Sequence, residues 1–441
     1  MKKKSPSPGQ KSARAFLFRK SGSAEGKMKP SPRLPAIGIR ELSASFPRMG
    51  VGKEFIDEAL GRMEDCLRFG VMLIRLESFD EKESGKERAL CLLKDTARSM
   101  EAVCTPAGGI WGLIEQALFG AFFPRGNESL CREYAEKIQA QMFCGGKKKL
   151  RIGISAYPLA RFARIDTIRN ARKALEHGDH SGSCPIRVFD AVSLHISGDR
   201  YYRQGKIKKA IEEFKTALVL NPSDADIHNS LGVCYGILGA QKSALEEFKT
   251  AAQIAPEDEM PLYNAGLICL QMGETGQALD SFFQSLEIKG DFFASLFRIA
   301  KIFLDRGQAE NSRVYFRKAL EVNPESGTTF RYLGQCCLIL GQEDEALAAF
   351  ENAVRLKADD AAALSELARL YERRGENPDI ALSFCRHSTE TAPENALYRR
   401  RLGRMYQKRG LLQEALAEFE KAQTLGHDCT VYIQEIKERT Q

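Results

Sequence analysis

The sequence lacks a C-x-x-C pair, an apolar run long enough to cross a membrane, and a recognisable secretion signal. Its twelve cysteines are scattered and only Cys336 and Cys337 are adjacent, which is typical of reduced thiols used as small apolar residues. No window approaches 18 consecutive apolar residues, so no membrane-spanning helix is expected. The chain begins MKKK, but the apolar run AFLF that follows is too short for a signal peptide. We therefore expect a cytoplasmic protein.

The net positive charge of the chain is confined to one segment. Residues 1–35 hold ten Lys or Arg and a single acid, Glu25, whereas the remaining residues are nearly neutral. The sequence pI of about 8.7 thus reflects a tail, and nucleic-acid binding by the folded part is not expected. Residues 1–40 are rich in Ser, Pro, Gly and Lys, a composition that predicts a disordered basic tail. Such a tail either makes weak contact with an anionic surface or is simply solvated.

A repeat of 34 residues occupies the second half of the chain. Three of its units are ADIHNSLGVCYGILGAQKSALEEFKTAAQIAPED (225–258), FASLFRIAKIFLDRGQAENSRVYFRKALEVNPES (293–326) and GTTFRYLGQCCLILGQEDEALAAFENAVRLKADD (327–360). Seven units fill residues 191–429, and the unit at 361–395 has one extra residue near Asn377. A period in this range predicts an array of stacked supersecondary units.

Each unit has the residues that a helix pair requires. A small residue, such as Gly232 or Gly334, lets the second helix cross the first closely. A glycine such as Gly239 then ends the first helix, because it tolerates the left-handed conformation. Ala244 and Phe248 lie one turn apart on the second helix. One short pair cannot bury its apolar face alone, so neighbouring pairs must stack into a superhelix.

This pattern resembles the tetratricopeptide repeat. The resemblance covers more than half of the chain, and it implies protein–protein recognition in a concave groove, without catalysis by the repeats. The last segment, residues 430–441, is expected to be the polar capping helix that such an array needs at an exposed end. The family's clamp for C-terminal carboxylates is not expected, because His195 and Asp199 stand where it has Lys and Asn.

The resemblance also implies which residues face the groove. In units two and three they form a mostly apolar strip, whereas in units four to seven they are mostly basic. The predicted peptide-binding residues are Asn229, Val233, Tyr263, Leu267, Lys301, Arg331, Gln335, Arg369, Arg373, Arg400, Arg404 and Lys408. Arginine suits carboxylates, so the basic wall predicts an acidic partner segment. The alternative is a solvated face that Glu and Asp on adjoining helices neutralise.

Residues 41–190 alternate strand-like and helix-like segments. Apolar runs predict strands at 69–79, 149–158 and 186–190, and helical spacing predicts helices at 86–103, 128–143 and 166–178. The fold class that follows is an α/β sandwich followed by an all-α superhelix. The order and wording resemble the GGDEF domain of diguanylate cyclases, through GISAYP, IRNARKALEHGDHSGSCPIRVFD and the strand ending in FFP.

The resemblance places the family's active positions on residues that cannot do its chemistry. The Gly-Gly-Asp-Glu turn falls on Glu115, Gln116, Ala117 and Leu118, and the strand that carries a metal-binding Asp has Arg75 there, with Glu77 two residues on. Two-metal phosphoryl transfer needs clustered carboxylates, which are missing, so the domain is expected to be degenerate and not an enzyme.

Two functions remain open on this sequence. One is a scaffold that holds a partner protein in the groove, and the alternative is a receptor for cyclic di-GMP or GTP that signals through the repeats. We expect no cofactor and no metal site. His177, His180 and Cys184 have ligand-like spacing, but three ligands in a natural turn are a weak indication.

Overall fold

A computed structural model describes residues 39–77, 86–143, 150–181, 185–375 and 377–440. The predicted basic tail lies outside these ranges, apart from its last two residues. Packing divides the described chain into two compact units, one that runs as far as Ile254 and one that begins at Ala255. None of the described helices is long and apolar enough to span a membrane.

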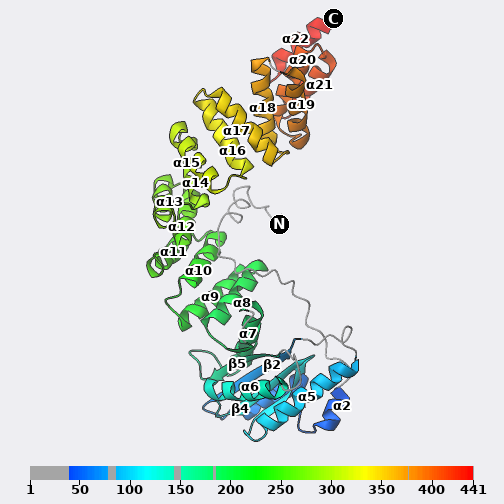
Figure 1. The fold of residues 1–441 in the computed structure, drawn as a ribbon, viewed down its shortest axis with the longest axis vertical. Coiled ribbons are helices and arrows are strands. Elements are labelled where there is room, and N and C mark those ends of the chain that lie inside the picture. The colour runs from blue at the N-terminus through cyan, green and yellow to red at the C-terminus, as the bar shows by residue number, and fades with distance from the viewer. Residues whose placement is uncertain (1–38, 78–85, 144–149, 182–184, 376, 441) are drawn as a thin grey trace, which may run out of the picture. The chain divides into compact units, whose positions relative to one another are not determined.

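The first unit begins with a mixed six-stranded sheet. Its strands are β1 (Gly50–Val51), β2 (Phe69–Leu76), β3 (Ile110–Glu115), β4 (Leu118–Pro124), β5 (Leu150–Tyr157) and β6 (Ile186–Val188), in the order β1-β3-β4-β2-β5-β6. The strand pairs β1–β3 and β5–β6 are parallel, and the other pairs are antiparallel. β3 and β4 form a hairpin whose second strand lies inside the sheet (Figure 1).

Helices cover both faces of this sheet, so the predicted α/β sandwich is confirmed as an architecture. One face packs against α2 (Ile39–Ser45), α5 (Lys86–Cys104) and α6 (Glu128–Phe143), with Ile74, Phe119 and Phe123 in the shared core. The other face packs against α3 (Gly52–Arg62) and α7 (Asp166–Ser181), through Val71 and Phe122. Residues Leu118 to Phe123 are all buried, because the alternate side chains of an interior strand enter the two cores.

Helix pairs follow the last strand without a linker. In the first unit they are α8 (Ala191–Arg203) with α9 (Ile207–Leu220) and α10 (Ala225–Leu238) with α11 (Gln241–Ile254). The second unit contains α12 (Glu259–Met272), α13 (Thr275–Ile288), α14 (Phe293–Asp305), α15 (Ala309–Val322), α16 (Gly327–Ile339), α17 (Glu343–Leu356), α18 (Ala361–Arg374), α19 (Pro378–Thr391), α20 (Ala396–Lys408), α21 (Leu412–Thr424) and α22 (Thr430–Thr440).

The repeated glycine and phenylalanine account for the spacing within each pair. A Cβ added at Gly232 would lie 2.6 Å from Cε1 of Phe248, and one added at Gly334 would lie 2.8 Å from Phe350. Both phenylalanines are fully buried. The small residue on the first helix therefore accommodates the aromatic ring of the second.

Candidate functional site

The structure brings together the positions that the cyclase resemblance singles out. Arg75 on β2 lies opposite Leu118 on β4, and the backbone N–H of Leu76 donates to the carbonyl of Ala117 at 3.0 Å. Ala117 itself has a φ of 57°, in the left-handed region. The tip of the β3–β4 hairpin is thus held against the end of β2.

Arginines hold both glutamates at this place. Glu115 accepts two hydrogen bonds from Arg172 on α7, at 2.8 and 3.2 Å, and Glu77 pairs with Arg151 on β5. Within the described residues no group of three or more His, Cys, Asp or Glu could hold a metal ion. A carboxylate paired with a cation is a poor Mg²⁺ ligand, since binding the metal would require the ion pair to break.

The weak metal candidate at the end of α7 is not assembled from described side chains. His177 is buried, and its Nδ1 lies 3.4 Å from Oγ of Ser193 and 3.7 Å from a carboxylate oxygen of Asp190. Cys184 lies outside the described residues, and so does the side chain of His180. His177 is therefore part of the packing between α7 and α8.

The ten cysteines that the structure describes are free and mostly buried, as the scattered pattern predicts. Burial raises the pKa of the Cys131 thiol to about 12. The pKa of Cys337 is raised to about 11, mainly by burial and to a smaller extent by the negative charge of the nearby Glu345. Both thiols are neutral at pH 7 and have little nucleophilic thiolate.

The apolar part of the predicted groove lies in the core instead of on an open surface. The exposed fractions of Asn229, Val233, Tyr263 and Leu267 are 6, 0, 1 and 4%. The Tyr263 ring packs against the rings of Phe282 and Phe292, with centroids 5.5 and 5.3 Å apart. A ligand would have to displace core packing to reach these residues. The family pattern predicts them from their positions in the repeat, and those positions do not account for local packing.

Acidic side chains neutralise most of the predicted basic wall. The pairs are Lys301 with Asp305 at 2.8 Å, Arg331 with Asp360 at 3.0 Å, Arg369 with Glu366 at 2.9 Å, Arg373 with Glu343 at 2.5 Å, and Lys408 with Glu372 at 2.6 Å. Asp360 also caps α18 by accepting from the backbone N–H of Ala363, so the Arg331 pair is part of the fold. Gln335, the uncharged member of the wall, is half-buried.

Arg400 and Arg404 on α20 differ from the other basic residues. Arg404 is exposed, and it makes no hydrogen bond or ion pair within the part of the chain that the structure describes. Arg400, one turn earlier, has a buried Nε without a hydrogen-bond partner. Two arginines on one face without a carboxylate between them attract an anion, and a planar guanidinium binds carboxylates in a fork. These two are the best candidates for contact with an acidic partner.

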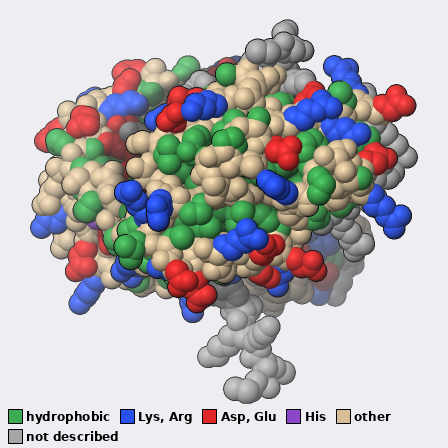
Figure 2. Space-filling model, turned by 90° about the horizontal axis from the view of Figure 1, so that it is seen from below, with side chains coloured by type: hydrophobic (Ala, Val, Ile, Leu, Met, Phe, Trp, Pro, Cys, Tyr) green, Lys and Arg blue, Asp and Glu red, His purple; other side chains and the backbone are tan. Residues whose placement is uncertain are grey.

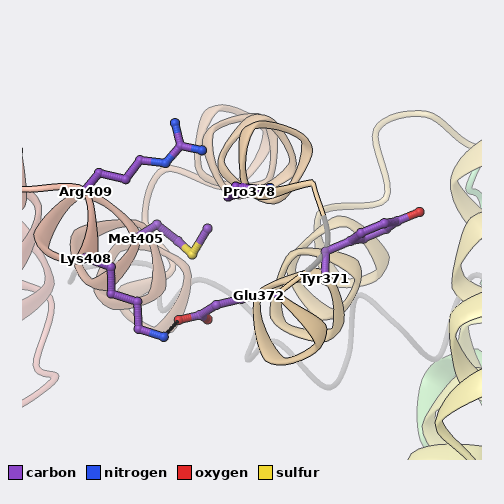
Figure 3. A pocket seen from close by; sticks show the side chains of 7 residues that line it. Tyr371, Glu372, Pro378, Met405, Lys408 and Arg409 are labelled. Atoms are coloured by element: carbon purple, nitrogen blue, oxygen red, sulfur yellow. Dashed lines mark ion pairs between the residues drawn. The ribbon is translucent and has the colours of Figure 1, made fainter.

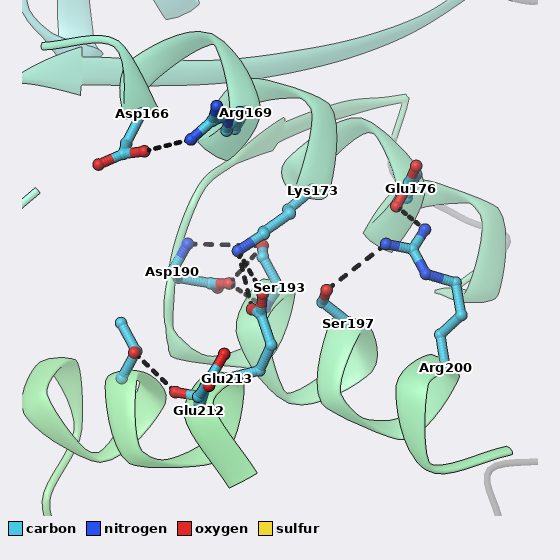
Figure 4. A network of polar contacts seen from close by, with 11 residues as sticks. Asp166, Arg169, Lys173, Glu176, Asp190, Ser193, Ser197, Arg200, Glu212 and Glu213 are labelled. Carbon is cyan, nitrogen blue, oxygen red and sulfur yellow. Dashed lines mark hydrogen bonds and ion pairs between the residues drawn. The ribbon is translucent and has the colours of Figure 1, made fainter. Parts of the chain in front are cut away.

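Sequence reasoning missed a polar network that joins the sheet to the first helix pair. Lys173 on α7 donates to both carboxylate oxygens of Glu213 on α9, at 2.9 and 2.8 Å, and Arg200 on α8 pairs with Glu176 (Figure 4). The side chain of Asp190 caps α8 in a reciprocal capping box with Ser193. The mixed charges along α7 were the only indication of this network in the sequence. They do not identify its members, because the acidic partner of Lys173 lies 40 residues later.

On the face that Figure 2 shows, the described charged side chains do not gather into a patch of one sign. There, basic and acidic side chains are interspersed, with apolar side chains between them. A nucleic-acid surface is normally a patch or stripe of one sign. Among the described side chains, this face shows no patch or stripe of that kind.

Comparison with known proteins identifies the repeats. Models of the TPR repeat and the tetratricopeptide repeat match residues 198–239 and 297–361, respectively. No curated protein sequence matches the chain significantly.

Solved structures with a similar course of the chain include three repeat proteins. YrrB, described as a TPR protein with an unusual peptide-binding site, is 24% identical, with a TM-score of 0.39 over 44% of this chain and 99% of its own. A tetratricopeptide repeat protein from Parabacteroides merdae is 20% identical, with a TM-score of 0.40 over 56% and 96%. A C-terminal part of a Cytophaga hutchinsonii repeat protein is 18% identical, with a TM-score of 0.45 over 54% and 98%. At these TM-scores the likeness supports no functional statement. The two matching models do establish that this chain carries tetratricopeptide repeats.

Proposed function

We propose that this protein is a scaffold that binds an acidic segment of a partner protein through its repeats. The observation that carries the proposal is the arginine pair Arg400 and Arg404 on the first helix of the last repeat, which has no carboxylate partner among the described residues. Tetratricopeptide repeats support a role in protein–protein interaction. The concave face of a solenoid is where such proteins usually bind.

The paired wall residues contribute less to this proposal. Exposed ion pairs are worth about 0–1 kcal/mol each, so a partner carboxylate could replace Glu343 beside Arg373, which is 64% exposed. Arg331 is only 18% exposed and its partner Asp360 only 9% exposed, so Arg331 is committed to the fold. Binding is therefore expected to concentrate on α20.

Charge reversal tests this function. The full chain and its Arg400→Glu/Arg404→Glu variant serve as baits for affinity capture, with mass spectrometry as the readout. We expect the partner to be lost from the variant by about tenfold or more, as for a desolvated interfacial charge. The control is Lys242→Glu/Lys249→Glu, which makes the same charge change on exposed residues of α11. Equal capture by the bait and the α20 variant would contradict the proposal.

We also infer that the sheet domain is a cyclase-like fold that has lost its catalytic carboxylates. The pairing of Glu77 with Arg151 and of Glu115 with Arg172 supports this inference, because both acids near the hairpin tip are engaged. The domain then contributes stability and a fixed attachment for the first repeats, and the partner specificity belongs to the repeats.

A further inference from the structure

A pocket of about 180 Å³ lies within the last two complete repeats. It is lined by residues from the end of α18, the beginning of α19 and the end of α20, among them Gly375, Pro378, Met405 and Lys408. Figure 3 shows the Met405 side chain extending toward the centre of this space, with Pro378 on one side and Glu372 on the other.

One inserted residue coincides with this pocket. In the other repeats the second helix begins two residues after the turn glycine, as from Gly239 to Gln241 or from Gly341 to Glu343. Here α19 begins three residues after Gly375, and Asn377 has a φ of 42°. Gly375 and Pro378, the residues that flank the extra length, both line the pocket. The insertion thus lengthens the connection at the point where the space opens.

The pocket combines an apolar interior with a charged rim. Met405 is 4% exposed and offers a polarizable thioether. The Tyr371 ring points away, since its hydroxyl donates to Glu351 at 2.8 Å, so it does not fill the space (Figure 3). At the rim, Lys408 pairs with Glu372 at 2.6 Å and Arg409 pairs with Asp379 at 2.7 Å.

Size limits what can bind. A cavity of about 150 Å³ holds a benzene molecule, so this one accommodates a single leucine, methionine or phenylalanine side chain. Cofactors and drug-sized ligands occupy clefts of about 300–1,000 Å³, which is larger than this pocket. The chemistry therefore fits one apolar side chain of a protein segment.

Resting on the function proposed above, we propose that this pocket takes one apolar side chain of the acidic partner segment. Arg400, Arg404 and Lys408 recur every fourth residue on one face of α20, beside Met405. The helix rises about 12 Å from Arg400 to Lys408, which an extended strand spans in about four residues. The partner's carboxylates accordingly lie within about four residues of its apolar anchor.

Four synthetic peptides serve as probes of this site. The parent is the acetylated, amidated octapeptide Gly-Ser-Leu-Ser-Glu-Ser-Glu-Gly, and the others replace Leu by Ala, both Glu by Gln, or all three. Each is titrated into the full chain labelled with ¹³C-methyl methionine, and the Met405 signal is assigned from a Met405→Leu variant. We expect the parent to shift this signal saturably, and either replacement to weaken binding about tenfold or more.

Two variants separate the pocket from the arginines. Deletion of Glu376 restores the spacing of the other repeats and should abolish the Met405 shift. Circular dichroism checks that each variant keeps its helices. Arg404→Glu should weaken the parent peptide while leaving any binding of the Gln peptide unchanged.

Several results would overturn the proposal. If the parent peptide binds but neither moves Met405 nor responds to the deletion, the pocket is not the anchor site and the scaffold function stands. If no peptide binds while charge reversal still abolishes partner capture, the anchor chemistry assigned here is wrong. If the Met405 signal shifts with protein concentration alone, a second copy of the chain is the occupant instead.

Discussion

The tip of the β3–β4 hairpin and the exposed face of α20 are both rich in charge, but they differ in how that charge is used. At the hairpin, Glu115 and Glu77 are each engaged by an arginine from the same domain. On α20, Arg400 and Arg404 have no acidic partner within the described residues. Paired charge serves the fold, and unpaired charge of one sign is free to bind a ligand. This difference favours recognition at the repeats over chemistry at the sheet.

The largest expected effect separates the two regions by how they unfold. Phe119→Ala in the sheet and Phe350→Ala in the repeats each remove a fully buried ring, and each should lower the free energy of unfolding by about 3–5 kcal/mol. Hydrogen exchange should differ, because a repeat contacts mainly its neighbours. Phe350→Ala should accelerate exchange in α16–α19 and leave the amides of β2 and β5 protected. Acceleration in both regions would show that the two do not unfold separately.

A smaller effect concerns the network between α7 and α9. Glu213→Gln leaves Lys173, which is 20% exposed, without its carboxylate, and should lower stability by about 1–3 kcal/mol. The control Lys173→Met/Glu213→Leu removes both charges and should recover part of that loss. Urea unfolding of the single and double variants measures the coupling. If Glu213→Gln is neutral, the pair does not stabilise this junction.

Thiol reactivity gives a further contrast between exposed and buried cysteines. At pH 8, iodoacetamide should modify the exposed Cys91 quickly, and it should modify Cys131 and Cys385 only after unfolding. Burial raises the pKa of both buried thiols to about 12, so they stay protonated in the folded chain. Unfolding returns these values to about 9, so the folded state loses stability as the pH rises from about 9 to 12. Peptide mapping by mass spectrometry measures the rates, and rapid native alkylation of Cys131 would contradict this assignment.

At the tip of the β3–β4 hairpin we expect neither catalysis nor nucleotide binding, which is the smallest effect of the series. If the proposed likeness to the cyclase domain holds, incubation of the full chain with GTP and Mg²⁺ should yield no cyclic di-GMP, because that likeness puts Ala117 and Leu118 where the family has its carboxylates. We also expect GTP and cyclic di-GMP to leave the melting temperature unchanged within about 1 °C, since a ligand stabilises only the state it binds. Product formation would overturn the loss of catalysis, and a concentration-dependent shift would support the receptor alternative.

Much of the fold follows from local pattern. Helical spacing predicts a helix at 128–143, and α6 has those bounds, because its apolar residues recur on one face. The 34-residue period likewise places every turn glycine. Nothing comparable indicates α3, whose short amphipathic stretch follows a segment without clear periodicity.

The candidate site is less accessible from sequence, because it depends on contacts between distant residues. Arg331 looks like a free cation in its own helix, yet its partner Asp360 lies 29 residues later. Val233 looks like a surface residue by analogy but is fully buried. The extra residue near Asn377 is visible in the sequence, whereas the pocket beside it requires the positions of three helices.

The packing between α7 and α8 limits which fragments of this chain can be expressed without exposing its core. Ala174 of α7 and Phe189 share one core with Phe214 of α9, and Lys173 bonds to Glu213 across the same boundary. A fragment that begins at residue 191 would expose that apolar surface to water and leave Glu213 without its cation, inviting self-association. Biochemical work on the repeats should therefore use the whole chain, since a repeat-only fragment would show non-specific association that the intact protein does not have.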